Sequence, residues 1–275
     1  MLWKFFLSLT ALMGQQSNSP VDELQYQPSA LPADRIFIPS QTGPQSRSAQ
    51  EQASRALHGE HFGGDMVFSE SWNTSDAGVR DTRFRWPGYP GGAVIPYVID
   101  QSAMNFRNVI LQGMDHYHRF TCIRFVPRTN QRDFIRIFYG NGCWSIIGRA
   151  GGRQDLSLGQ GCAYVGLVIH ELGHAIGLFH EHQRSDRDNY ITVYRNNVVS
   201  GQEHNFDSTN PNNELIYTQY DYNSIMHYGN YAFSRQPNTL PTMVAKNGQR
   251  LVEPYDKAGF TNSDLVTIRK LYQCS

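Results

Sequence analysis

Three histidines and a glutamate stand close together in the middle of this 275-residue sequence, within HELGH at 170–174 and, six residues on, at His180. Residues four apart in a helix share one face, so His170 and His174 could present two imidazoles to one cation. Gly177 can adopt the left-handed conformation that ends a helix, which would bring His180 in as a third ligand. Three neutral imidazoles leave one position of a tetrahedral zinc ion for water. This pattern predicts a catalytic Zn2+ site with one ion.

Glu171 lies between the first two histidines and is offset from both on the helix. Its carboxylate is therefore expected beside the open position of the metal and not on it, where it could act as a general base. The alternative is a set of histidines and a glutamate on a partly exposed helix face. A bare HExxH arises by chance, whereas its extension by Gly177 and His180 favours the metal site.

A second motif, SIMHY at 224–228, follows later in the chain. Met226 could form a polarizable apolar floor beneath three imidazoles, and Tyr228 could reach the metal or an oxygen that develops negative charge. As isolated residues, both would more often be ordinary core. His182 and His227 also lie near the motifs in sequence, but neither is expected as a ligand because the three-histidine set is already complete.

The charge balance limits the classes of partner. The chain carries 24 lysine and arginine residues against 24 aspartate and glutamate residues. A protein that follows a nucleic-acid backbone or an anionic membrane usually needs a basic excess. Proteins or peptides are therefore the expected partners, and a monomer is the expected state.

The N-terminus has the pattern of an export signal. Residues 1–14 place one lysine near the start of a short apolar run that soon meets polar glutamines, as in a signal peptide. The alternative is a buried N-terminal helix. The run is shorter than the roughly 20 apolar residues of a membrane span, and no later stretch is expected to anchor the chain. A signal peptide over 1–14 predicts a secreted, extracellular protein.

Cys122, Cys143, Cys162 and Cys274 form an even set with no CxxC pair. If the chain is exported, two disulfides are expected. Three connectivities are open, of which a short Cys143–Cys162 loop with a long Cys122–Cys274 closure is favoured.

The remaining pattern predicts an α+β fold. Residues 15–54 are rich in Gln, Ser, Pro and Ala and are expected to be extended or disordered. Strands are expected at 92–99, where Pro96 suits an edge strand, and at 122–126 and 134–139. Apolar residues at helical spacing predict helices at 105–120 and 164–178, and the chain is then expected to be loop-rich until a short helix at 264–272.

From Phe62 onward the chain resembles the astacin family of metallopeptidases, a branch of the metzincins. The resemblance rests on the extended zinc motif, its continuation HEHQRSDRD at 180–188, SIMHY, and the CWS and GC elements around Cys143 and Cys162. It implies a zinc endopeptidase whose catalytic domain has an N-terminal sheet-and-helix lobe and a loop-rich C-terminal lobe around a zinc cleft. It also supports the favoured disulfide pairing and implies that Tyr228 is a movable fifth ligand.

The resemblance extends to FGGD at 62–65, which is similar to the FxGD element of astacin proenzymes. It implies that Asp65 is a zymogen latch that coordinates zinc in place of the catalytic water. The expected division is a signal peptide at 1–14, a propeptide at 15–76 and a peptidase domain at 77–275. An activating protease would cut near Ala77, or after Arg80 or Arg83. The new N-terminus would then lie near Glu181, although the segment from Trp86 to Val94 is longer than the family pattern.

Two expectations concern the substrate. A peptide would lie extended as an added strand along the edge near Trp144–Ile146. Arg184 and Arg187 could shape an acid-preferring pocket, with salt bridges to Asp186 and Asp188 as the alternative.

Overall fold

The computed structural model describes residues 47–69 and 80–275. The predicted signal peptide, most of the predicted leader and Ala77 lie outside these ranges. The chain divides into Met1–Pro39 and Ser40–Ser275, and everything below concerns the second unit. In the described residues, no helix is both long and apolar enough to span a membrane.

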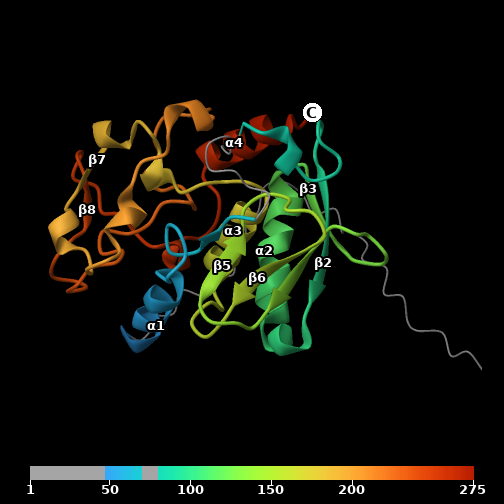
Figure 1. Ribbon diagram of the computed structural model, residues 1–275, viewed down its shortest axis with the longest axis horizontal. Coiled ribbons are helices and arrows are strands. Elements are labelled where there is room, and N and C mark those ends of the chain that lie inside the picture. Colours follow the sequence, from blue (N-terminus) through green and yellow to red (C-terminus); the bar gives the residue numbers. More distant parts are fainter. Residues whose placement is uncertain (1–46, 70–79) are drawn as a thin grey trace, which may run out of the picture. The chain divides into compact units, whose positions relative to one another are not determined.

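A six-stranded sheet forms one half of this unit (Figure 1). Its strands are β1 (Met66–Val67), β2 (Ala93–Ile99), β3 (Ile123–Pro127), β4 (Phe134–Phe138), β5 (Cys143–Ile146) and β6 (Arg153–Leu158). The spatial order is β1-β5-β6-β4-β2-β3, and every neighbouring pair is parallel except β5 and β6. Without β1, strand β5 would be the edge of the sheet.

The three predicted strands are present, but the expectation that Pro96 marks an edge strand is wrong, since β2 lies between β3 and β4. The amide of Ala93 donates to Cys122 on the β3 side, and the next amide donates away from β3, to Pro87. By alternation, the nitrogen of Pro96 faces the β4 side. Pairing with β4 begins only at Tyr97, so no ladder hydrogen bond is lost at Pro96.

Helices α2 (Arg107–Phe120) and α3 (Val165–Ala175) pack against each other beside the sheet (Figure 1). A Cβ on Gly113 of α2 would lie 2.4 Å from Cγ1 of Val168, so the two helices approach closely at this glycine. From Gly166 to Ala175 every residue of α3 is buried. Helix α4 (Asn262–Tyr272) begins with a capping box between Thr261 and Asp264. All three helices lie where the apolar spacing predicts them.

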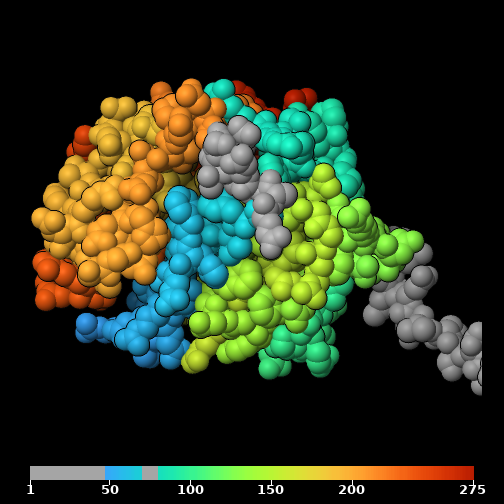
Figure 2. Space-filling model, in the orientation of Figure 1, coloured from blue at the N-terminus to red at the C-terminus, as the bar shows by residue number. Residues whose placement is uncertain are grey.

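The expectation of an unstructured leader through residue 54 is wrong for its described part. Helix α1 spans Arg47–Leu57 and buries Ala53, Ala56 and Leu57. These three residues lie on one helical face. Burial of that face offsets the conformational entropy that the segment loses when it folds, although its overall composition is polar. Figure 2 shows residues 47–69, in blue and cyan, lying between the yellow-green part of the surface and the gold and orange part.

After α3 the chain is loop-rich, as expected. It contains a two-stranded antiparallel sheet of β7 (Ile191–Val193) and β8 (Met243–Ala245). Between α3 and α4 the other regular elements in the described residues are short 3₁₀ turns, namely η3 (Glu181–Gln183), η4 (Arg187–Asn189), η5 (Arg195–Asn197), η6 (Glu203–Phe206), η7 (Pro211–Asn213) and η8 (Pro254–Asp256). Two further 3₁₀ turns, η1 (Thr82–Phe84) and η2 (Gln101–Phe106), lie before α3.

Candidate metal centre

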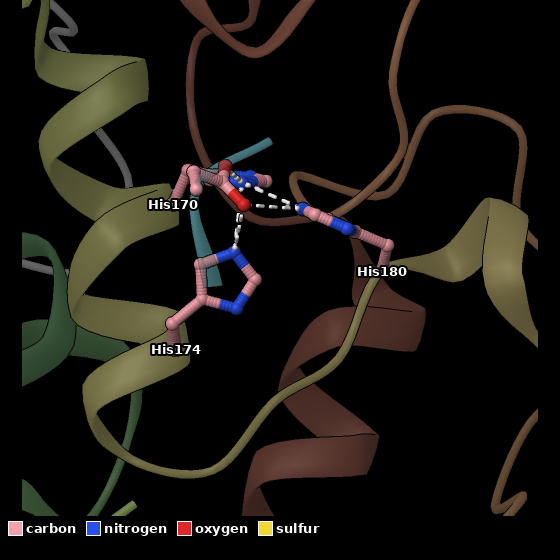
Figure 3. Close-up of side chains that lie close together, drawn as sticks. His170, His174 and His180 are labelled. Carbon is pink, nitrogen blue, oxygen red and sulfur yellow. Dashed lines mark hydrogen bonds and ion pairs between the residues drawn. The ribbon is translucent and has the colours of Figure 1, made fainter. Parts of the chain in front are cut away.

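Helix α3 and the loop after it bring the three predicted histidines together. His170 and His174 project from one face of α3, and Gly177 has a φ of +100°, which reverses the chain and returns His180 to the same point. The Nε2 atoms of His174 and His180 lie 3.1 and 3.3 Å from that of His170. Figure 3 shows the three rings turned toward a common point.

The outer nitrogen of each ring is fixed by a hydrogen bond. Nδ1 of His170 lies 2.8 Å from the carbonyl of Ile225, and Nδ1 of His174 lies 2.8 Å from the carbonyl of Leu178. A carbonyl can only accept, so both Nδ1 atoms carry the proton and both Nε2 atoms keep a free lone pair. Nδ1 of His180 faces Oε1 of Gln183 at 3.0 Å in the same manner. Burial lowers the pKa of His170 to about 4 and also lowers that of His180.

Asp65 closes the cluster from a segment 105 residues earlier. Its Oδ2 lies 2.9 Å from Nε2 of His170, and its Oδ1 lies 3.3 and 3.1 Å from those of His174 and His180. All four side chains are completely buried.

These four donors fit one divalent cation. Nitrogen and oxygen ligands about 2.1 Å from a tetrahedral ion lie about 3.4 Å from one another. Nε2 of His170 lies 3.1 and 3.3 Å from those of His174 and His180, and the Asp65 oxygens lie 2.9 to 3.3 Å from the three Nε2 atoms. One ligand atom from each of the four residues can be chosen so that all four lie within 4.8 Å of one another. Three imidazole lone pairs and a carboxylate directed at one point would also repel one another without a positive charge between them. The cluster therefore has the geometry and the electrostatics of a metal site.

Glu171 is buried beside the cluster but outside it. Both of its carboxylate oxygens lack a hydrogen-bond partner among the described residues. Burial, together with the negative charge of Asp65, raises the pKa of Glu171 well above its usual value. A buried carboxylate without a partner is costly, and such a group is suited to accept a proton from a small polar molecule.

Tyr228 and Met226 meet the histidines from the turn at 224–228. The Tyr228 hydroxyl donates to Oδ2 of Asp65 at 2.6 Å, and its ring lies 4.4 Å from that of His180. Burial first, and Asp65 second, raise the pKa of Tyr228. Met226 packs against α3, since a Cβ on Gly173 would lie 2.8 Å from its sulfur.

Two residues that position the histidines are not indicated by the sequence. The first is Gln183, which orients His180. Asp264, at the start of α4, accepts hydrogen bonds from Ser224 Oγ at 2.6 Å and from the Ile225 amide at 3.0 Å, which fixes the carbonyl that holds His170. The capping pattern at Thr261 predicts the helix start, but no local signal links Asp264 to a turn 39 residues earlier.

Glu181 lies in a pocket next to the centre, together with Arg184 and Glu214. Its Oε1 accepts from Nη1 of Arg184 at 2.7 Å and from the Asp221 amide at 2.8 Å. Arg184 also pairs with Asp186 at 2.8 Å, and Arg187 pairs with its sequence neighbour Asp188. Both arginines therefore form the salt bridges that the sequence offered as the alternative to an acid-preferring pocket. His182 and His227, which are buried, are not part of the cluster.

The edge near Trp144–Ile146 is occupied by the chain itself. Met66 and Val67 of β1 pair with Ser145 and Ile146 of β5. The Ser145 amide donates to the carbonyl of Asp65 at 2.9 Å, so the same strand pairing also positions the carboxylate on the histidines.

The structure contains the disulfides Cys122–Cys274 and Cys143–Cys162. The first joins the start of β3 to the chain just after α4, and the second joins β5 to the loop before α3. Both links brace elements that carry or flank the centre.

Comparison with known proteins gives one consistent result. The family model for the astacin peptidases matches residues 79–273. The chain is 37% identical over 215 residues to astacin-like metalloprotease toxin 1 from Loxosceles intermedia, covering 77% of this chain and 80% of the toxin. It is 39% identical over 236 residues to zinc metalloproteinase nas-8 from Steinernema carpocapsae, covering 82% of this chain and 55% of that protein.

Among solved structures, the chain matches high choriolytic enzyme 1, a hatching enzyme zinc-protease from Oryzias latipes, with a TM-score of 0.62 and 36% identity. That match covers 75% of this chain and 98% of the hatching enzyme. The chain thus spans most of the toxin but about half of nas-8.

Proposed function

The chain belongs to the astacin family of zinc metallopeptidases, and from this premise we propose that it is a secreted endopeptidase made as an inactive precursor. The proposal rests on one observation. The carboxylate of Asp65 contacts three imidazoles and accepts a hydrogen bond from the hydroxyl of Tyr228. The inhibitory group and the groups it blocks come from distant parts of one chain.

His170, His174 and His180 would hold the zinc ion through Nε2. Zinc bound there would supply the positive charge that lowers the pKa of water from about 15.7 towards 7 and polarises the scissile carbonyl. Their outer nitrogens already donate to fixed acceptors, so the rings would not need to reorient when an ion enters.

Glu171 would take the proton of the attacking water and return it to the leaving amine. Its buried, unpartnered carboxylate and its raised pKa support this role. Tyr228 would donate its hydroxyl proton in a hydrogen bond to the oxyanion once Asp65 no longer accepts it. Met226 would support the histidines from below as an apolar floor.

Residues 15–76 would form the propeptide, and Asp65 would occupy the position of the catalytic water. Latency would depend on more than this carboxylate, because β1 also fills the edge of β5 where an extended substrate would bind. Signal peptide 1–14 and peptidase domain 77–275 complete the proposed division.

Activation would require cleavage by another protease, near Ala77 or after Arg80 or Arg83. The new N-terminal ammonium would then approach Glu181, whose carboxylate lies in the pocket with Arg184 and Glu214. In the described structure the Glu181 carboxylate is satisfied by Arg184 and the Asp221 amide, so the ammonium would join an existing network.

Secretion is supported by the two disulfides, which persist in oxidising compartments. The substrates would be proteins or peptides bound in extended form, and the active species would be a monomer. The name of one relative, a toxin, describes that relative alone.

The test is expression of the full chain as a secreted protein, with zinc measured before and after treatment with a trypsin-like protease. The treated protein should contain one zinc ion per chain and release peptides from an unfolded protein mixture, whereas treated Glu171→Gln protein should keep zinc and release none. Zinc binding with no proteolysis by the treated wild type would instead indicate a zinc-stabilised binding protein.

A further inference from the structure

A histidine of the proposed propeptide fills a niche next to the metal centre. The ring of His58 lies 4.9 Å from the ring of Tyr228 and 4.8 Å from that of Phe233. Its Nε2 lies 3.5 Å from Oε2 of Glu253, and the two side chains are only 7% and 10% exposed. His58 is thus enclosed by two aromatic walls with a carboxylate at the far end.

His58 is the main partner of the Glu253 carboxylate in the described structure, with smaller contributions from the Gly229 amide and from Lys257. Its Oε1 packs over Gly229, where an added Cβ would come within 2.7 Å, but Oε2 has no hydrogen-bond partner in the described residues. The nearby ammonium of Lys257 donates instead to the carbonyls of Ser224 and His227. His58 is therefore the group that faces Oε2.

The niche adjoins the path proposed for the substrate. Tyr228 forms one wall, and its hydroxyl contacts Asp65 at the histidine cluster. His58 and Asp65 belong to the same propeptide segment, so removal of that segment would empty both positions together. A substrate that replaced the segment would meet the niche one aromatic ring away from the reacting groups.

We propose that this niche, with Glu253 at its base, is a subsite for a basic side chain of the substrate. The proposal rests on the function proposed above. Removal of His58 would take away the main partner of a buried carboxylate, which the Gly229 amide and Lys257 satisfy only in part. The emptied niche therefore favours a cation over a neutral or acidic group. A cationic side chain placed over the ring face of Tyr228 or Phe233 would also be attracted to it. His58 is the propeptide's own stand-in for that side chain.

The experiment uses the full chain, expressed and cleaved by the trypsin-like protease, with release of the propeptide checked by mass spectrometry. Unstructured fluorescent peptides carry Lys or Gln at one position at a time, and the other positions are constant. Dissociation constants are measured by fluorescence anisotropy on Glu171→Gln protein, which is expected not to consume the peptide. Hydrolysis of the same peptides is measured with protein that retains Glu171.

At one peptide position, Lys should bind about tenfold more tightly than Gln, which corresponds to about 1.4 kcal/mol. Adding Glu253→Gln should reduce this ratio to below twofold, and Glu253→Asp should give an intermediate ratio. Asp256→Asn is the matched control, because Asp256 is an exposed carboxylate three residues away, and it should leave the ratio unchanged.

A Lys-to-Gln ratio below twofold at every position in protein that retains Glu253 overturns the proposal, and this comparison needs no substitution at Glu253. The proposal is also overturned if Glu253→Gln folds and preserves the ratio. Hydrolysis without any basic preference in binding would refute this subsite alone. A Glu253-dependent preference in binding without hydrolysis would refute the proposed peptidase activity and leave the niche supported.

Discussion

The hydroxyl of Tyr228 donates a 2.6 Å hydrogen bond to Oδ2 of Asp65, a residue 163 positions earlier in the chain. The same carboxylate lies 2.9 to 3.3 Å from the Nε2 atoms of three histidines. The Asp65 side chain therefore lies where a metal ligand would bind. It also accepts the hydrogen bond of the hydroxyl that would otherwise stabilise an oxyanion. Loss of Asp65 frees both at once.

Asp65→Ala is expected to make the uncleaved precursor partly active. A hydrogen bond to a charged group contributes about 1.5–3 kcal/mol, so the hydrolysis rate without activator should rise at least about tenfold. Zinc content should not change, because the three histidines remain. The measurements are peptide hydrolysis and zinc per chain. Glu60→Ala, which removes an exposed acid of the same segment, should stay latent, and equal latency of the two variants would show that Asp65 is not the latch.

Glu171→Gln and Tyr228→Phe should separate catalysis from metal binding in the activated protein. Loss of the general base should lower kcat about 10²–10⁴-fold, and loss of the oxyanion donor should lower it about 10²–10³-fold. Both variants should keep one zinc ion. The measurements are kcat from steady-state kinetics and zinc per chain from metal analysis. If the activity of Tyr228→Phe fell in proportion to its zinc content, the tyrosine would act in metal retention instead.

The histidines were predictable because their positions are local. His174 follows His170 by four positions, and one glycine with positive φ suffices to return His180. The contacts that orient them were not predictable. The partner of His170 is the carbonyl of Ile225, which lies 55 residues away, and such a contact is decided by how the C-terminal loops pack.

Strand and helix positions followed from apolar spacing, whereas strand order did not. Pro96 favours an edge strand by sequence because proline lacks an amide hydrogen, but in β2 its nitrogen faces a stretch where pairing with β4 has not begun. Helix α1 was missed because its polar sequence offers one apolar face of three residues. That face packs partly against residues more than 80 positions later in the sequence, since Gly142 and Gly161 both approach Ala56.

The stability of the precursor should depend on the protonation of Glu181. Burial, only partly offset by Arg184 and the Asp221 amide, raises the pKa of Glu181 to about 7. A carboxyl with a raised folded-state pKa contributes stability below its usual pKa of 4.5, and this contribution is lost as the pH rises through about 7. The loss between these values should be about 1–3 kcal/mol, because a tenfold change in proton affinity corresponds to about 1.4 kcal/mol and the side chain is partly screened.

Urea unfolding of the precursor between pH 5 and 8 measures this effect. Glu181→Gln cannot titrate at this position, so the wild type should lose stability relative to the variant as the pH rises. Groups that titrate equally in both proteins, including the histidines, cancel in the difference. Parallel stability curves would mean that Glu181 does not titrate in this range.

Gly177→Ala should weaken the metal site through the backbone. Gly177 has a φ of +100°, and an added Cβ would approach only Arg85 Nη1 at 3.7 Å and Gly148 Cα at 4.0 Å, so the penalty is conformational rather than steric. Forcing a non-glycine residue into this region costs about 1–2 kcal/mol. Relief of the strain would shift His180, and zinc affinity should fall about 10–100-fold, as it does when a ligand loses its orientation.

Gly151→Ala is the matched control for this substitution. Gly151 has a φ of +86°, and an added Cβ would meet nothing within 4 Å, so its backbone penalty is similar but lies away from the histidines. Both variants should lose a comparable free energy of unfolding in urea, while only Gly177→Ala should release zinc to a competing chelator at lower concentration. If Gly151→Ala lowered zinc affinity equally, metal binding would follow global stability. A loss of zinc affinity in Gly177→Ala alone would show that the backbone conformation of Gly177 holds His180, the third ligand, in place.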